Sequence, residues 1–168
     1  MKESALDQAR PPWFLANDST SSELTNLAWR WVESGFAVRI VRGQKMKTVQ
    51  AMFDEMAAAL QFPDYFGENW PAFGECLADL DWLPAGNGYA IAILNAADVL
   101  ADEPRGLEVL VRILNRVASE WSEPVAVGEP WDRPAIPFHI VLQIPENRMK
   151  SVRKRWSDAG ADIELPKS

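Results

Sequence analysis

Few side chains in this sequence are suited to covalent or metal chemistry. The chain of 168 residues has one histidine, His139, and one cysteine, Cys76. His139 lies between apolar neighbours in an expected strand, and Cys76 falls on the apolar side of an expected helix, so we interpret both as structural residues. One Cys with one His cannot form a structural zinc site, and no carboxylate run has calcium-binding spacing. We therefore expect no catalytic residue, no metal site, no cofactor and no enzymatic activity.

The carboxylates are more informative, because they are concentrated in one segment. Between Thr48 and Pro104 the sequence has no Lys, Arg or His and carries ten acids, so this segment has charge −10 while the whole chain has −7 and the remainder +3. The ten acids are Asp54, Glu55, Asp64, Glu68, Glu75, Asp79, Asp81, Asp98, Asp102 and Glu103. An acidic chain argues against nucleic acid as a direct ligand, because Lys and Arg supply most of that affinity. The asymmetry favours a basic partner.

An acidic stripe is expected on a helix that begins at Asn69 as N-cap and ends near Leu80. At about 100° per residue, one side of this helix carries Glu68, Ala72, Glu75 and Asp79, whereas the other side is apolar. No Lys or Arg stands three or four positions from Glu75 or Asp79, so nothing on the helix compensates their charge. The small residues Pro71, Ala72, Gly74 and Ala78 border the stripe and would let another surface approach. A solvated surface is the alternative interpretation of such a stripe.

The elements that must position this helix follow from capping residues and hydrophobic periodicity. Helices are expected at 20–35, 48–62, 69–80, 104–121 and 146–159, and strands at 36–42, 89–94 and 138–144. The apolar runs 89–94 and 138–144 are typical of strands buried on both faces, which favours a parallel sheet. The prolines of 122–137 disfavour a helix or a strand there. Strands that alternate with helices predict an α/β layer fold.

Location is predicted from features that the sequence lacks. No run approaches the roughly 18 apolar residues of a membrane span, and the first residues, Met1 to Asp7, include no apolar core of a signal peptide. A single cysteine excludes an internal disulfide and fits a reducing compartment. We expect a cytoplasmic protein with no membrane contact.

One motif carries a family resemblance. Phe62-Pro63-Asp64-Tyr65-Phe66-Gly67-Glu68-Asn69-Trp70, followed by Glu75-Cys76-Leu77, resembles the marker of the barstar family, the intracellular inhibitors of the secreted ribonuclease barnase. The resemblance implies a three-layer α/β fold with a small three-stranded parallel sheet flanked by helices, plus N- and C-terminal extensions. The expected division is an N-terminal extension with one helix at 1–35, a barstar-like domain at 36–145, and a basic C-terminal helix and tail packed on it at 146–168.

The resemblance also implies a function. A bacterial inhibitor of this family blocks the basic active site of a secreted microbial ribonuclease with its acidic helix and the preceding loop, and we expect it to be monomeric when free. Tyr65 matches the motif aromatic that contacts the enzyme, and Glu75 matches the central carboxylate. The expected partner-binding residues are Tyr65, Phe66, Gly67, Glu68, Asn69, Trp70, Glu75 and Asp79. Pro71 and Gly74 stand where the family usually has an aspartate and an aromatic, so an interaction or immunity module that binds a different basic partner or toxin is the alternative.

Overall fold

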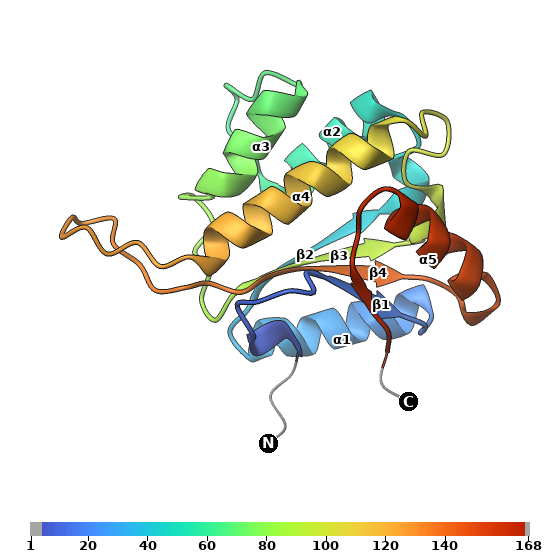
Figure 1. Cartoon of the computed structure of the whole chain (residues 1–168), viewed down its shortest axis with the longest axis horizontal. Coiled ribbons are helices and arrows are strands. Elements are labelled where there is room, and N and C mark those ends of the chain that lie inside the picture. The colour runs from blue at the N-terminus through green and yellow to red at the C-terminus, as the bar shows by residue number, and fades with distance from the viewer. Residues whose placement is uncertain (1–4, 167–168) are drawn as a thin grey trace.

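A twisted parallel sheet forms the centre of the molecule in the computed structural model, which describes residues 5–166 (Figure 1). Its strands are β1 (Phe14–Asn17), β2 (Ala37–Arg42), β3 (Tyr89–Leu94), β4 (Phe138–Gln143) and β5 (Ile163–Glu164), in the order β2-β3-β4-β1-β5. The α-helices are α1 (Ser21–Glu33), α2 (Val49–Leu60), α3 (Trp70–Asp79), α4 (Gly106–Ser122) and α5 (Met149–Asp158). Short 3-10 turns lie at Ala5–Asp7, Gly43–Lys45, Ala96–Asp98 and Glu146–Arg148. Residues 1–4 and 167–168 of the expected extensions lie outside the described residues.

Two hydrophobic layers cover the two faces of the sheet. α1 packs on one face, and α2, α3, α4 and α5 pack on the other (Figure 1). Strand β3 shows why a continuous apolar run suits this position, since Ile91 and Ile93 enter the larger core while Ala90 and Ala92 face α1. The predicted α/β layer architecture is therefore confirmed.

Local sequence signals set the helix starts. Thr20 and Glu23 form a capping box at α1, in which the Glu23 N–H donates to Thr20 Oγ1 at 3.2 Å and the Thr20 N–H donates to Glu23 Oε2 at 2.8 Å. At α2 the Ala51 N–H donates to Thr48 Oγ1, also at 3.2 Å. These caps confirm the predicted starts of both helices. Helix α4 begins at Gly106, two residues after the expected start at Pro104.

The three-stranded sheet expected from the resemblance is wrong, because the sheet has five strands. β1 pairs in parallel with β4 and with β5, so segments from both ends of the chain extend the sheet. Phe14 of β1 is fully buried and its ring lies 6.1 Å from that of Trp156 on α5. Strands of four and two residues are too short to show a period, and β1 is specified by the unpaired edge of β4 beside it.

No helix within residues 5–166 is long and apolar enough to cross a membrane.

Candidate partner-binding surface

The motif loop and helix α3 are held in place by Asn69. Its side-chain oxygen accepts a hydrogen bond from the Ala72 N–H at 2.9 Å, and its side-chain amide donates to the Gly67 carbonyl at 3.1 Å. Pro71 occupies the first turn, where a backbone N–H has no intrahelical partner. The predicted N-cap is thus confirmed, and the Asn69 amide is occupied within the loop.

Aromatic packing fixes the loop against α2. The ring of Phe53 on α2 lies 5.7 Å from Phe66, 5.1 Å from Trp70 and 5.7 Å from Phe73. Phe62 packs edge-on against Phe66 at 5.0 Å. Two of the expected contact residues, Phe66 and Trp70, are therefore half-buried and support the surface from beneath.

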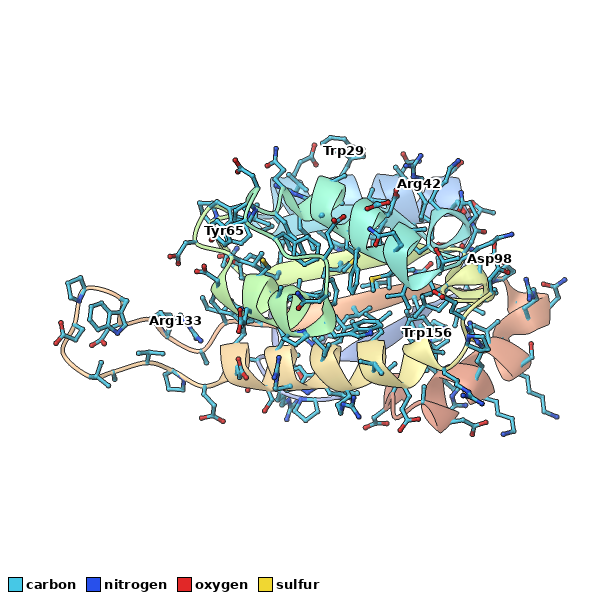
Figure 2. All side chains as sticks on the ribbon, turned by 90° about the horizontal axis from the view of Figure 1, so that it is seen from above. Trp29, Arg42, Tyr65, Asp98, Arg133 and Trp156 are labelled. Carbon is cyan, nitrogen blue, oxygen red and sulfur yellow. The ribbon has the colours of Figure 1, made fainter. Side chains whose placement is uncertain are left out.

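Four of the expected contact residues meet around one depression. Tyr65 is 74% exposed, and Glu75 and Asp79 are exposed on α3. Together with Phe66, Ala72 and Cys76 they line a shallow hollow of about 170 Å³. The side chain of Tyr65 projects from the loop above α3 (Figure 2). The fold therefore assembles an exposed phenol and two carboxylates from the loop and the helix.

Glu68 does not continue the acidic stripe. It lies before the N-cap with a left-handed backbone (φ 50°), where the helical spacing used to place it does not apply. Its carboxylate accepts a hydrogen bond of 3.0 Å from the amide of Gln50 on α2, and the same amide donates to Asp54 at 3.1 Å. Glu68 is thus directed toward α2 and does not line the hollow.

Gly74 also departs from the sequence expectation, which grouped it with small residues open to a partner. It is buried against α4, where an added Cβ would lie 2.3 Å from Nη2 of Arg116 and 3.4 Å from Cγ2 of Ile113. The lack of a side chain at this position serves the close packing of α3 on α4. Pro71 remains exposed, and Ala72 and Ala78 are half-buried.

Asp81 is a component of this surface that sequence reasoning did not place there. Leu80, the C-cap of α3, has a left-handed backbone (φ 47°, ψ 26°), which turns the chain so that Asp81 lies near Asp79. Partial burial and the negative charge of Asp81 raise the pKa of Asp79. Slight desolvation by its neighbours, followed by the effects of Asp79, Cys76 and Asp81, raises the pKa of the exposed Tyr65 phenol. Leucine rarely adopts this conformation, so the sequence contains no signal for the turn.

The surface carries negative charge that the described part of the chain leaves uncompensated. Glu55 of the acidic segment is paired with Arg42 at 2.7 Å, whereas no ion pair within residues 5–166 involves Glu75, Asp79 or Asp81. Carboxylates in this arrangement are suited to binding a cationic group, because no competing cation must first be displaced.

The geometry gives no support to catalysis at this surface. Cys76 is buried, as the sequence predicts, and burial, with smaller effects of Asp79 and Glu75, raises the pKa of its thiol. A thiol with a raised pKa is a poor nucleophile. His139 is buried in β4, and burial lowers its pKa to about 4. Over residues 5–166, no group of three or more Cys, His, Asp or Glu side chains is placed to hold a metal ion.

Comparisons with known proteins bear on these observations. No curated protein matches the chain. Chains in three solved structures of the Drosophila origin recognition complex (ORC) are similar in fold at low identity. The match to a chain of ORC bound to GC-rich DNA and Cdc6 has a TM-score of 0.49 and 12% identity, and it covers 91% of the present chain and 47% of the ORC chain. For ORC bound to AT-rich DNA and Cdc6 the TM-score is 0.48 and the identity 14%, with coverages of 92% and 50%. For ORC bound to DNA the TM-score is 0.45 and the identity 11%, with coverages of 92% and 78%. The present chain spans about half the length of the first two.

The family comparison is specific. The family model described as "Barstar (barnase inhibitor)" matches residues 36–143, which is more than half of the chain and includes the motif loop, α3 and the strands β2, β3 and β4. This range agrees with the part of the sequence, about Phe36 to Pro145, that carries the resemblance. The chain belongs to the barstar family.

Proposed function

We propose that this protein is a non-enzymatic inhibitor that occupies the basic active site of a microbial ribonuclease of the barnase type. The observation that carries the proposal is the cluster of Tyr65, Glu75 and Asp79 around one hollow, with Asp81 beside it and no ion pair to any of the three acids among residues 5–166. The inhibitor acts in the bacterial cytoplasm, is monomeric when free and uses no cofactor.

The physical basis is charge complementarity. A ribonuclease active site that binds the phosphates of RNA presents Arg, Lys and His side chains, and exposed carboxylates on a rigid helix can take the place of those phosphates. Opposite surface potentials also steer the two proteins together, so association should slow as salt screens the field. Glu75 lies in the middle of α3, one turn before Asp79, and lines the hollow, and we assign it the role of entering the active site.

Charge reversal tests the proposal. We expect Glu75→Lys to abolish inhibition of RNA cleavage by a purified barnase-type ribonuclease, and Glu75→Gln to weaken it. The matched control is Glu33→Lys, because Glu33 is an exposed helical glutamate on α1, across the sheet from α3. Circular dichroism and thermal unfolding establish that each variant is folded. Inhibition by Glu75→Lys equal to that of the wild type would refute the proposal.

The second candidate is an immunity or interaction module that binds a different basic protein or toxin. It is favoured by two positions, since Pro71 offers no charge and Gly74 is enclosed by α4, whereas the family usually has an aspartate and an aromatic at these places. High-affinity binding to a basic toxin that is not a ribonuclease, together with no inhibition of barnase-type enzymes, would select this candidate. Loss of that binding in Glu75→Lys would then locate the same surface.

A further inference from the structure

A long arm, residues 123–137, projects from the end of α4 and returns to β4 (orange in Figure 1). Its two sides are joined by an antiparallel bridge, in which Val125 and Arg133 exchange two N–H···O bonds of 2.9 Å each. Its four prolines further restrict the backbone. The arm is thus a defined hairpin-like projection.

The tip of the arm presents two apolar side chains to solvent. Trp131 is 67% exposed and Val127 is 68% exposed. The carboxylate of Asp132 closes the tip by accepting hydrogen bonds from the N–H groups of Val127 at 2.9 Å and Gly128 at 2.8 Å. Because these bonds already fix the backbone of the tip, binding through Trp131 costs little backbone conformational entropy, and tryptophan is frequent among energetically dominant interface residues.

Arg133 anchors the base of the arm to α4. Its guanidinium lies over the indole ring of Trp121, with Cζ 4.4 Å from the ring centroid. It donates hydrogen bonds to four backbone carbonyls, at distances of 2.9 to 3.2 Å: Glu120, Trp121, Glu123 and Pro134. These contacts determine the direction in which the arm leaves the body.

The same tryptophan connects the arm to the acidic surface. The indole N–H of Trp121 donates a 2.9 Å hydrogen bond to the carbonyl of Leu77 on α3. The ring of Tyr89 packs on that of Trp121 at 5.1 Å, and the charges of Arg133, Asp81 and Asp79 all act on the Tyr89 hydroxyl and its pKa. In both views the arm projects from the end of the molecule at which α3 lies (Figures 1 and 2), and Tyr65 is labelled at that end in Figure 2.

The charge of the arm continues that of the acidic surface. Residues 123–137 carry Glu123, Glu129 and Asp132 against Arg133, a net charge of −2. The guanidinium of Arg133 keeps its charge, but it is bound to backbone carbonyls and lies over Trp121 at the base of the arm, so the three carboxylates dominate the charge of the arm. A cationic protein drawn to Glu75 and Asp79 is therefore also attracted toward the arm.

We propose that the arm is a second contact element of the partner-binding surface, and that Trp131 inserts into an apolar pocket on the same cationic protein that Glu75 engages. This inference rests on the proposed function. The two elements contribute differently to binding. The carboxylates of α3 supply charge complementarity, and the tip of the arm supplies apolar area that is buried away from the active site of the partner.

The test compares four forms of the full chain: wild type, Trp131→Ala, Trp29→Ala and Glu75→Lys. Trp29 is the matched control, since it is a tryptophan that is 61% exposed on α1, across the sheet. Affinities for barnase and a panel of purified barnase-type ribonucleases are measured by calorimetry at low and high salt. Trp131→Ala should weaken binding about tenfold or more, and by the same factor at both salt concentrations, because burial of an apolar side chain is not screened. Trp29→Ala should bind as the wild type does.

The outcomes separate the inference from the proposed function. If Glu75→Lys abolishes binding while Trp131→Ala binds as Trp29→Ala does, the arm is not a contact element and the proposed function stands. If no ribonuclease binds, or if Glu75→Lys binds normally, the proposed function fails and the inference fails with it. Hydrogen exchange gives a second measurement, in which the amides of residues 125–133 should be slowed in the complex, and unchanged exchange there would overturn the inference.

Discussion

The indole N–H of Trp121 on α4 donates a hydrogen bond of 2.9 Å to the carbonyl oxygen of Leu77 on α3. Leu77 lies in the last turn of α3, where a backbone carbonyl has no intrahelical partner, and the buried indole satisfies it. The guanidinium of Arg133 lies over the ring of the same tryptophan. The side chain of Trp121 therefore joins α3, α4 and the base of the arm.

Replacement of this indole should destabilise the protein. Trp121→Phe leaves the buried carbonyl of Leu77 without a donor and weakens the cation–π contact of Arg133 with the ring at position 121. We therefore expect a loss of about 1–3 kcal/mol in the free energy of unfolding. Urea denaturation measures the loss, and Trp29→Phe, at an exposed site, is the control. A difference between the two variants smaller than about 0.5 kcal/mol would contradict this role for Trp121.

Asp79→Asn should separate stability from binding. The pKa of Asp79 is raised in the folded protein, so the folded state binds the proton more tightly than the unfolded state does and stability falls as pH rises through that pKa. At neutral pH the asparagine removes repulsion from Asp81 and an unfavourable charge at the C-terminal end of α3, and the variant should be more stable by less than roughly 1 kcal/mol.

The gain from Asp79→Asn should disappear in acid, where Asp79 itself becomes protonated. Chemical denaturation at pH 7 and at pH 3 measures the change, with Asp64→Asn in the exposed motif loop as control. The same variant should bind its ribonuclease more weakly, because it lacks a carboxylate of the hollow. Greater stability of the wild type at pH 7 would exclude the expected repulsion.

His139 should make the fold sensitive to acid. Burial lowers the pKa of its imidazole to about 4, below the ordinary value of 6.5, so the unfolded chain takes up a proton that the folded chain does not. The stability contributed by the neutral folded imidazole is complete above pH 6.5 and is lost as pH falls toward 4. Up to about 3 kcal/mol can be lost in this range, at 1.36 kcal/mol per pKa unit.

His139→Leu tests this dependence. Nδ1 of His139 is buried and has no hydrogen-bond partner within the described part of the chain, so leucine removes an unsatisfied polar atom. Unfolding free energies measured between pH 7.5 and pH 4.5 should decline less steeply in the variant than in the wild type. Parallel curves for the two proteins would assign the acid sensitivity to other groups.

Alanine at position 74 should leave the stability of the protein unchanged or higher, whereas a large aromatic residue should lower it. An alanine Cβ requires only the exposed guanidinium of Arg116 to move, and alanine favours a helix by up to about 1 kcal/mol over glycine, so Gly74→Ala should be neutral or stabilising. Gly74→Trp must displace Ile113 as well and should destabilise the protein by roughly 1–3 kcal/mol. Thermal unfolding of the two variants checks the contrast. Equal stability would show that this position is open to solvent.

Local signals made much of the fold predictable. The caps at Thr20, Thr48 and Asn69 act within four residues, and the apolar runs of β3 and β4 report burial on both faces, so helix starts and central strands are encoded in short stretches of sequence. The motif from Phe62 to Trp70 indicated the family and the loop that carries Tyr65. The roles of Tyr65 and Glu75 in contacting a partner remain predictions.

The rest depended on contacts between segments far apart in the chain. β1 exists because β4 offers it an edge, and Gly74 is enclosed because α4 packs on α3. Glu68 turns toward α2 because its carboxylate accepts a hydrogen bond from the Gln50 amide there. Whether Asp81 joins Asp79 depends on a left-handed leucine that local propensity disfavours. The sequence by itself determined the α-helices, the strands β2, β3 and β4 and the acidic segment. Only the tertiary structure decided where the edge strands pair, which carboxylates share a surface and where the arm projects, because those positions are set by packing between elements.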